Sequence, residues 1–600
     1  MSNVVVLQVV LIGALASGPA WADDAGNDTR PDQDVADSLF AEPVQDSPAA
    51  ATPAADADAD DDETLASIPV RTTPAPPAMG RDDAGAPMQL EEIVVTATKR
   101  AASPRELPSS ISAVRGQDLE KIGAQGQEDF LKQVPGVTFV NDQITPNRIT
   151  IRGIGADLNT SNTTGVFLGD VPFEDPTLPR LTLDPNPFDL ARVEVLKGPQ
   201  GTLFGGSALN GAVRYIPEDP SLAGWEGKVY MQVENVFEGG LGTSYGAAVN
   251  VPLGDTFALR VVGFDRHSAG WVDDLGRDLE DVNELDQQGG RVTSLWQPNE
   301  SWKISAMVVA QQTDVADSSI TDNRDGNLSR SNTPAASPVS SKYDLETLGI
   351  QYSFDSFDVQ SQTSRAAKTF NGRVDASRIG NIPNPPPLVT IYNDNESEAL
   401  MQELRFTSND GAHPDWKWLG GVFYRKVLMR EVSDILASNQ QLPIPPALLD
   451  ALAGLIPGFN GIITEDGRIN TARGEADPID VREAALFGEV TSTFWDAFEV
   501  TLGLRAFRNT SDSRVVFSGV LAANLSEPTI ERVVEGRIVE SGINPKLALK
   551  YTFNEHVAIY AAASRGFRFG GAQVLVGTLT SQAPDFYKLD TLWAYEAGLR

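Results

Sequence analysis

Six hundred residues is too long for one ordinary small domain, since domains usually run to roughly 100–200 residues. The chain has 47 Lys and Arg against 82 Asp and Glu, a formal charge of −35, which excludes nucleic-acid binding through a general basic surface. Cysteine is absent, which excludes disulfides, thiolate metal sites and cysteine nucleophiles. The chain has only 3 histidines, far apart in sequence, so few are available for a zinc site or as a catalytic base.

The N-terminus has the pattern of an export signal, which we predict to be residues 1–22. An apolar run from Val4 to Leu15 is followed by the small-x-small sequence Ala20-Trp21-Ala22. The run has about twelve residues, fewer than the roughly 20 of a membrane-spanning helix, and no run of spanning length follows it. Met1-Ser2-Asn3 lacks the usual basic residue, so either the start codon lies elsewhere or this region is weak. The alternative is a buried N-terminal strand.

Residues 23–88 are rich in Ala, Pro and Asp. We predict a disordered acidic leader, because the segment has too few apolar residues to bury a core. The run Asp56–Glu63 could suggest a calcium site. It lacks the glycine turn and the ligand spacing of a calcium loop, so we interpret it as part of the leader.

A short β-branched segment, residues 89–100, follows the leader. It has the pattern of a strand without a partner, and such a strand can join the edge of another protein's sheet through main-chain hydrogen bonds. The residues that would do so are Glu91, Glu92, Ile93, Val94, Val95, Thr96, Ala97 and Thr98. An ordinary first strand of the following domain fits the segment equally well.

Residues 101–220 have the pattern of a globular α+β domain. We predict strands at Ile111–Val114 and Asn147–Gly155, with a helix-like stretch at Gly116–Lys132 between them. The apolar side of this stretch would hold Leu119, Ile122, Phe130 and Leu131. Gly165–Phe173 predicts two strands that turn at Gly169-Asp170, and Asp189–Gly201 predicts a helical turn, a strand and a glycine turn.

The stretch from Glu91 to Pro220 resembles the plug domain of TonB-dependent outer-membrane receptors. Its first residues, Glu91–Ala97, resemble the TonB box. Three further segments resemble plug motifs. Each match alone is weak evidence for the family, but together the matches are highly specific. The matching residues are Arg152, Gly153, Gly155, Arg192, Glu194, Gly198, Pro199, Gly201 and Gly211.

Residues 221–600 contain about fourteen strand-like segments in which apolar and polar residues alternate, such as Ser244–Leu253 and Trp302–Gln311. Roughly ten-residue alternating segments separated by turns are typical of transmembrane β-barrels, whose closed sheets satisfy every backbone group in lipid. Tight turns are expected at Gln297–Glu300 and Asp355-Ser356. Longer polar connections are expected at Asp314–Lys342, Ala366–Glu396 and Arg430–Asp480.

Later segments again resemble the receptor family, for example Gln402–Phe406 and Ser564–Arg568. The fold class that we predict is an all-β membrane protein, with an α+β plug domain inside an antiparallel transmembrane β-barrel. Plugged transporters of this type have 22 strands, so roughly eight C-terminal strands would be missing. We therefore predict a fragment or a truncated gene, whose barrel cannot close and exposes two sheet edges.

The resemblance implies a monomeric active importer in the outer membrane of a Gram-negative bacterium, with no cofactor. Energy would come from the periplasmic C-terminal domain of TonB and its inner-membrane complex, and Glu91–Thr98 would pair with TonB by strand addition. Arg192 and Glu194 are expected to form plug–barrel ion pairs that loosen during transport, or to pair for simple structural reasons.

We expect the ligand to be a ferric siderophore, the commonest cargo of the family, with a saccharide or cobalamin as the alternative. No ligand-binding residue and no metal site can be assigned from the sequence. The chain lacks the nucleophile elbow, the phosphate-binding loop and the dinucleotide motif of common enzymes, so we do not expect catalysis. A passive porin-like barrel and a secreted all-β hydrolase are more distant alternatives.

Overall fold

A computed structural model describes residues 93–141, 147–156, 162–176, 184–321, 327–331, 334–377, 389–409, 415–437, 469–518, 531–572 and 585–600. The chain divides into two units, Met1–Met88 and Gln89–Arg600, and every described residue belongs to the second. The predicted export signal, the acidic leader with Asp56–Glu63, and Glu91 and Glu92 lie outside the described residues. No helix in the described ranges is long and apolar enough to cross a membrane.

The first part of the second unit, residues 93–220, is called the N-terminal domain here. A five-stranded sheet in the order β1-β6-β7-β4-β5 forms its centre, and β4 runs parallel to β7. A separate pair joins β2 and β3. The elements are β1 (Ser110–Arg115), α1 (Gly116–Lys121), α2 (Gln127–Leu131), β2 (Val137–Val140), β3 (Arg148–Ile151), β4 (Thr164–Leu168), β5 (Val171–Pro172), β6 (Leu190–Lys197), α3 (Gly201–Phe204) and β7 (Gly211–Pro217).

Two predictions for this domain have different outcomes. The strand pair that turns at Gly169-Asp170 is confirmed, since β4 and β5 pair antiparallel there. The single helix-like stretch Gly116–Lys132 is wrong, because it is two short helices, and Ile122 is 49% exposed between them. Glycine is a poor helix former, and Gly123 and Gly126 both fall in the interruption.

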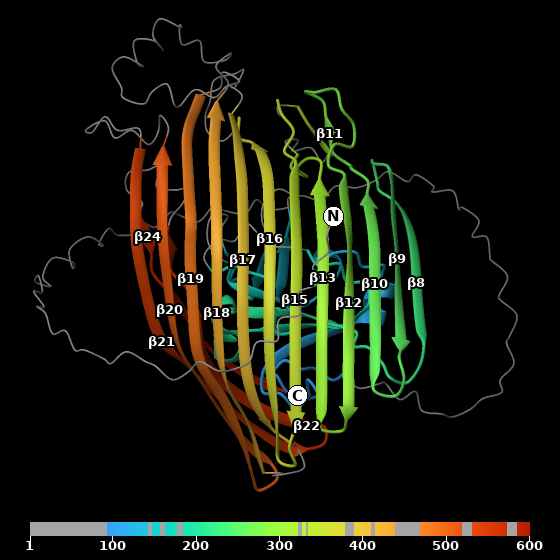
Figure 1. The fold of residues 1–600 in the computed structure, drawn as a ribbon, viewed down its shortest axis with the longest axis vertical. Helices are drawn as coiled ribbons and strands as arrows, with labels where there is room; N and C mark the ends of the chain where they lie inside the picture. Colours follow the sequence, from blue (N-terminus) through green and yellow to red (C-terminus); the bar gives the residue numbers. More distant parts are fainter. Residues whose placement is uncertain are drawn as a thin grey trace, which may run out of the picture. The chain divides into compact units, whose positions relative to one another are not determined.

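Most of the rest of the unit is a fourteen-stranded antiparallel sheet, called the large sheet here, whose strands run side by side in Figure 1. The fourteen strands confirm the number expected from the sequence. Its edges are β8 and β25. The strands are β8 (Glu226–Asn235), β9 (Leu241–Pro252), β10 (Phe257–Ser268), β12 (Leu285–Asn299), β13 (Trp302–Val315), β15 (Val339–Ser353), β16 (Phe357–Asp375), β17 (Val389–Ser408), β18 (Trp416–Ala437), β19 (Ile469–Phe494), β20 (Phe498–Ser518), β21 (Glu531–Asn554), β22 (Val557–Arg568) and β25 (Asp590–Leu599).

Four very short strands lie outside these sheets. They are β11 (Asp273–Asp274), paired with β14 (Ser329–Arg330), and β23 (Gly571–Ala572), paired with β24 (Phe586–Tyr587).

The two faces of the large sheet differ in polarity, as β20 illustrates. Arg505 and Asn509 are buried on one face, whereas Leu502 is 58% exposed and Leu504 is 49% exposed on the other. A polar inner face and an apolar outer face are the reverse of a soluble protein and are typical of a barrel wall in lipid.

Several expected connections have different limits in the structure. The tight turn at Asp355-Ser356 is confirmed, whereas β12 continues to Asn299 and shortens the turn expected at Gln297–Glu300. The loop expected at Ala366–Glu396 is wrong over much of its length, because β16 continues to Asp375 and β17 begins at Val389. β18 and β19 likewise extend into the Arg430–Asp480 stretch. In these extensions of β16, β17, β18 and β19, polar residues occur on both faces of the strand, so apolar and polar residues do not alternate in the sequence.

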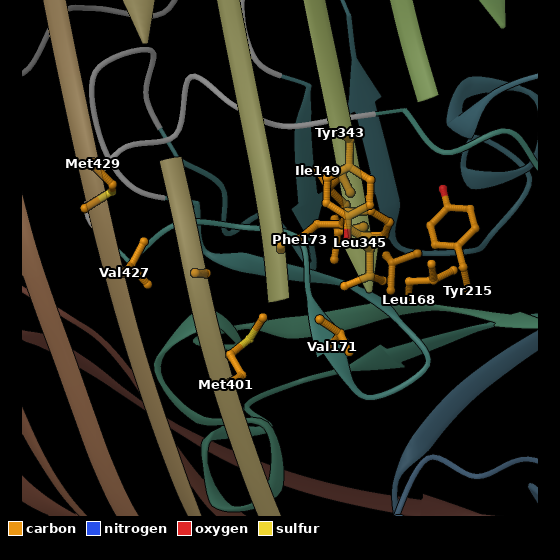
Figure 2. Close-up of a cluster of buried hydrophobic side chains, with 14 of the residues drawn as sticks. Ile149, Leu168, Val171, Phe173, Tyr215, Tyr343, Leu345, Met401, Val427 and Met429 are labelled. Carbon is orange, nitrogen blue, oxygen red and sulfur yellow. The ribbon is translucent and has the colours of Figure 1, made fainter. Parts of the chain in front are cut away.

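The main hydrophobic cluster joins the N-terminal domain to the large sheet (Figure 2). From the N-terminal domain, Val171 and Phe173 lie in or beside β5. They pack in the same cluster as Tyr343 of β15 and the methionines Met401 and Met429 of β17 and β18. The ring centroids of Phe173 and Tyr343 are 4.8 Å apart. Full burial of one such side chain contributes roughly 1.5–3 kcal/mol, so this packing holds the two parts together.

Candidate functional site

The segment Ile93–Arg100 folds back on itself against the N-terminal domain. The backbone N–H of Val95 donates to the carbonyl of Ala102 at 2.8 Å, and the reverse bond is 2.9 Å. Val95 and Ala97 are 0% and 1% exposed, and they share a hydrophobic cluster with Phe167 and Phe204. The sequence left open whether this segment is a strand without a partner or the first strand of the following domain. In the structure it makes one bridge within its own chain, Val95 with Ala102, and buries two of its apolar side chains.

Thr96 is held by a buried carboxylate of strand β6. The backbone N–H of Thr96 donates to Oε1 of Glu194 at 2.7 Å. The same oxygen accepts from Nε of Arg192 at 2.8 Å, and Oε2 accepts from Nη1 of Arg214 at 2.6 Å. The Glu194 side chain is 0% exposed, so its charge depends on these donors. Hydrogen bonds to a charged group contribute about 1.5–3 kcal/mol each. The bond from Thr96 to the Glu194 carboxylate therefore holds the segment against the N-terminal domain.

Arg214 connects Thr96 to the turn between β4 and β5. Its Nη1 donates to Oγ1 of Thr96 at 3.1 Å, and its Nη2 donates to Oδ1 of Asp170 at 2.8 Å. The other carboxylate oxygen of Asp170 accepts from Nη1 of Arg405 on β17 at 2.9 Å. Burial opposes the ionisation of Asp170, but Lys99, Arg405 and Arg214 outweigh it and hold the pKa of Asp170 well below its usual range.

The residues that follow Thr98 are attached to the large sheet. Nζ of Lys99 lies 2.6 Å from Oε2 of Glu403, and its side chain is 3% exposed. The ammonium lies 5.6 Å and 5.1 Å from the ring centroids of Phe204 and Phe487. Burial lowers the pKa of Lys99, while Glu403 opposes that shift. Arg100 donates to Oγ of Ser408 at 2.8 Å and to the carbonyl of Trp418 at 3.1 Å.

The first glycine motif, at Arg152, Gly153 and Gly155, follows strand β3. Gly153 and Gly155 are exposed. Arg152 lies 2.8 Å from Glu596 of β25, which makes it a contact between the N-terminal domain and the large sheet.

The second motif brings the backbone of the N-terminal domain close to other chain segments. Gly198 has a φ of 101°, which favours glycine, and Pro199 is buried directly after it. A Cβ at Gly201 would lie 2.9 Å from the carbonyl oxygen of Arg565 on β22. A Cβ at Gly211 would lie 2.5 Å from the carbonyl oxygen of Leu196. These glycines permit close packing within the domain and against the large sheet.

Of the two expectations for Arg192 and Glu194, ion pairing with the barrel is wrong for Glu194, and structural pairing within the N-terminal domain is what the structure shows. The ion pairs that the structure places on Glu194 are with Arg192 and Arg214, both in the N-terminal domain. The reason is topological, because β6 lies between β1 and β7 near the middle of the five-stranded sheet.

Most of the ion pairs that cross to the large sheet use residues that the plug motifs did not single out, although Arg152–Glu596 uses a motif residue. The others include Lys99–Glu403, Asp170–Arg405, Asp175–Lys368 and Asp189–Arg260. The sequence weakly indicated two of these residues. Glu403 and Arg405 fall in the family-like segment Gln402–Phe406. Arg214 directly follows the closing glycine turn.

Within the described residues, no group of three or more His, Asp or Glu side chains could hold a metal ion. His267 pairs with Asp286 at 2.8 Å, and His413 lies outside the described residues.

Two family models match the chain. The TonB-dependent receptor plug domain matches residues 103–212, and the TonB-dependent receptor-like β-barrel matches residues 283–600. An iron-regulated outer membrane virulence protein of Vibrio cholerae is 32% identical over 184 residues, which cover 29% of this chain and 27% of that protein. The ferripyoverdine receptor of Pseudomonas aeruginosa is 28% identical over 135 residues, which cover 21% of this chain and 15% of that protein. The aligned part thus spans about a quarter or less of these curated relatives.

Solved structures share the fold. The ferric yersiniabactin uptake receptor of Yersinia pestis has a TM-score of 0.66 at 15% identity, covering 82% of this chain and 70% of that chain. The ferripyoverdine receptor of Pseudomonas aeruginosa, bound to ferripyoverdine, has a TM-score of 0.61 at 15% identity, covering 84% and 62%. With the barrel model matching residues 283–600, more than half of the sequence, the chain belongs to the TonB-dependent receptor family.

Proposed function

We propose that this protein is a TonB-dependent active importer of the outer membrane and that its cargo is a ferric siderophore. The observation that carries the proposal is the attachment of Ile93–Thr98, the segment that resembles the TonB box, to Glu194 and Arg214. A partner that withdraws this segment must break a buried charge network of the N-terminal domain. A pulling force on this segment therefore acts directly on the central sheet of the domain, through Glu194 of β6 and Arg214 of β7.

The physical need for such a handle supports the proposal. The outer membrane has no nucleotide energy source, so energy must arrive mechanically through a protein that spans the periplasm. The segment Glu91–Thr98 would bind the C-terminal domain of TonB by strand addition, in which main-chain hydrogen bonds give the affinity. Val94 is 49% exposed, which offers an initial contact before the buried Val95 and Ala97 are released.

The choice of cargo rests on the relatives. Their names include ferripyoverdine, ferrioxamine B and hemin receptors, and one is an iron-regulated outer membrane protein. A siderophore holds its iron with its own ligands, so the protein needs shape and polar contacts rather than imidazole or thiolate groups. A chain with 3 histidines and no cysteine suits such a chelate better than it suits direct binding of haem iron.

Two measurements test the proposal. The protein should be more abundant in outer membranes of iron-starved cells than of iron-replete cells. Cells should also take up radioactive iron supplied as ferrioxamine B or ferripyoverdine only when TonB is functional. Uptake that does not depend on TonB would indicate a passive pore, and TonB-dependent uptake of a saccharide or cobalamin instead would overturn the choice of cargo.

A further inference from the structure

The apolar outer face of the large sheet begins at a row of aromatic rings. The ring centroids of Trp302 and Tyr352 are 4.8 Å apart, and those of Phe354 and Phe357 are 4.7 Å apart. These residues lie at or beside the tight turns that join β12 to β13 and β15 to β16. Aromatic residues mark the level at which a barrel wall enters lipid. The number of residues from this level to the first outward-facing charge therefore measures how much of each strand suits lipid.

The apolar stretch is long on β20 and β21. It runs for ten residues from Phe498 to Arg508 on β20, and for fourteen residues from Tyr551 to Arg537 on β21. A membrane-crossing strand needs roughly 9–11 residues. Both strands therefore reach across the lipid before they present a charge.

The apolar stretch is shorter on β15, β16 and β17, which lie side by side in Figure 1. It ends after six residues on β15, at Glu346, and after eight residues on β16 and β17, at Arg365 and Glu398. The counts start at Tyr352, Phe357 and Phe406, the aromatic residues at that end of each strand. The side chains of Glu346, Arg365 and Glu398 are 58%, 46% and 56% exposed. Lipid tails offer no partner to charges at this depth, so another surface is expected to cover them.

Part of this polar region is satisfied within the chain. Nε of Arg365 donates to Oε1 of Glu398 at 2.8 Å, and Nη1 of Arg365 lies 3.7 Å from Oε1 of Glu346. Closer to the aromatic rings, Oγ1 of Thr363 donates to Oε1 of Gln402 at 2.5 Å. The residues that face outward here are called the polar patch: Lys342, Asp344, Glu346, Thr363, Arg365, Glu396, Glu398 and Gln402.

Two opposite charges of the polar patch have no partner. Lys342 of β15 and Glu396 of β17 are exposed and form no ion pair with any residue that the structure describes. Both lie in one row across the sheet, because Lys342 is opposite Thr369 of β16 and Thr369 is opposite Glu396. Both also line a hollow of about 460 Å³. The chain thus holds a free base and a free acid at the same level, on either side of β16.

A second copy of the chain fits this arrangement. Two copies in one membrane are related by a twofold axis along the membrane normal, which keeps every residue at its own depth. An axis that passes over β16 places β15 of one copy opposite β17 of the other. Lys342 of each copy then faces Glu396 of the other. Ala367 and Thr369, which face outward on β16, are small and allow the two walls to approach closely.

The charges of the polar patch favour a second copy over a lipid headgroup. Its acids outnumber its bases, with Asp344, Glu346, Glu396 and Glu398 against Lys342 and Arg365. Such a surface repels an anionic headgroup. A contact between identical surfaces instead needs both signs in matching places, and the row through β16 provides them.

We propose that the polar patch is the contact surface of a homodimer in the membrane, held by reciprocal pairs between Lys342 and Glu396 on either side of β16. The family resemblance implied a monomer, and this surface points to a different state. A wall that is too short for the lipid is also stabilised by association, because fewer lipids then meet the mismatch. The inference uses neither TonB nor the cargo, so its tests are independent of the proposed function.

Cross-linking in isolated outer membranes tests the dimer. Because the chain has no cysteine, Thr363→Cys introduces a single thiol on β16, and a short bismaleimide should join it to the same thiol of a second copy. Leu502→Cys on β20, 58% exposed on the same face, is the matched control and should give roughly tenfold less dimer. Equal yields at the two positions, or no dimer from Thr363→Cys, would overturn the inference. A product that joins Thr363→Cys to a different protein would overturn the choice of partner.

Charge reversal, carried out in the Thr363→Cys chain, tests the reciprocal pairs. Lys342→Glu places two acids opposite each other in the dimer, and Glu396→Lys places two bases opposite each other. Each single change should lower the yield of dimer roughly tenfold, and the double change should restore it. Arg514→Glu, at an exposed pair with Glu535, is the control and should leave the yield unchanged. Because Lys342 and Glu396 do not pair within one chain, failure of the double change to restore the dimer would overturn the pairing.

A spin label distinguishes a second copy from lipid headgroups if the cross-linker does not reach. In reconstituted bilayers, labels on Thr363→Cys of two copies should broaden each other's spectrum and should be shielded from a water-soluble nickel complex. Labels on Leu502→Cys should show no broadening. A label on Thr363→Cys that meets the nickel complex and is not broadened would mean that headgroups and water cover the polar patch, which would overturn the inference.

Discussion

The backbone N–H of Thr96 lies 2.7 Å from Oε1 of Glu194, a carboxylate with no solvent exposure, although 98 residues separate the two positions. This bond ties the segment that resembles a TonB box to the central sheet of the N-terminal domain. Its strength depends on the charge of Glu194, since that charge also attracts Arg192 and Arg214.

The variant Glu194→Gln should therefore loosen the segment Ile93–Thr98. The amide is neutral, so the bond to Thr96 loses its charge assistance, a loss of about 1 kcal/mol, since a hydrogen bond to a charged group contributes roughly that much more than a neutral one. A spin label on Val94→Cys, an exposed position in a cysteine-free chain, would report the change as a narrower spectrum. Glu128→Gln, which alters the exposed pair with Lys132, is the matched control. A spectrum identical to that of the parent would contradict the importance of the Glu194 charge.

The pair Lys99–Glu403 should show strong coupling. Glu403→Gln leaves the buried Lys99 ammonium without its partner and should lower stability by about 3–5 kcal/mol. Lys99→Met should cost less, because Arg405 still donates to Glu403 at 3.0 Å. The double variant should lose less than the sum of the two, because it removes the Lys99 ammonium that Glu403→Gln leaves without a partner. Thermal unfolding of the four proteins in detergent measures this coupling. Strict additivity of the two effects would show that the pair contributes little.

Glu174, a buried acid two residues after β5, should make the stability of the protein depend on pH. Burial raises the pKa of Glu174 to about 8 from an ordinary value of 4.5, and the neighbouring Asp175 adds to the shift. Asn162, Lys368 and Arg425 oppose it. Because the folded pKa is raised, the stabilising contribution is complete below about pH 4.5 and is lost as the pH rises toward 8.

The variant Glu174→Gln mimics the protonated acid and should remove this part of the pH dependence. Its melting temperature should match that of the parent near pH 4.5 and exceed it at pH 8, since only the parent then carries a buried negative charge. The measurement is a pair of melting curves at the two pH values. A variant that is less stable than the parent at pH 8 would mean that Glu174 is charged and well paired there.

Gly201 and Gly566 lie where the N-terminal domain packs closely against β22, so a side chain at either position should destabilise the protein. A Cβ at Gly566 would overlap the carbonyl oxygen of Leu209, and a Cβ at Gly201 would lie 2.9 Å from the carbonyl of Arg565. Gly566→Ala should cost about 1–3 kcal/mol, because backbone atoms cannot move aside easily. Faster trypsin cleavage within residues 103–212 would report it. Gly227→Ala, where a Cβ would meet nothing within 4 Å, should cleave like the parent.

Local patterns predicted much of the fold. Alternation of apolar and polar residues has a period of two that is visible within ten residues, so the fourteen strands of the large sheet could be counted from the sequence. The hairpin turn at Gly169-Asp170 was predictable for the same reason, because turn residues act within a few positions. Strand ends were less predictable where β16 and β17 extend into polar sequence.

The charge network shows what the sequence by itself did not determine. The motifs indicated that Arg192 and Glu194 matter, but they could not indicate that both serve Thr96 rather than the large sheet. Lys99 and Glu403 are 304 positions apart, and Asp170 and Arg405 are 235 positions apart. Such pairs depend on the sheet register and on how the N-terminal domain sits against β17, and no local pattern encodes either. The sequence determined most of the elements and the family, whereas the tertiary structure decided which of the 129 Lys, Arg, Asp and Glu residues lie close enough to act together.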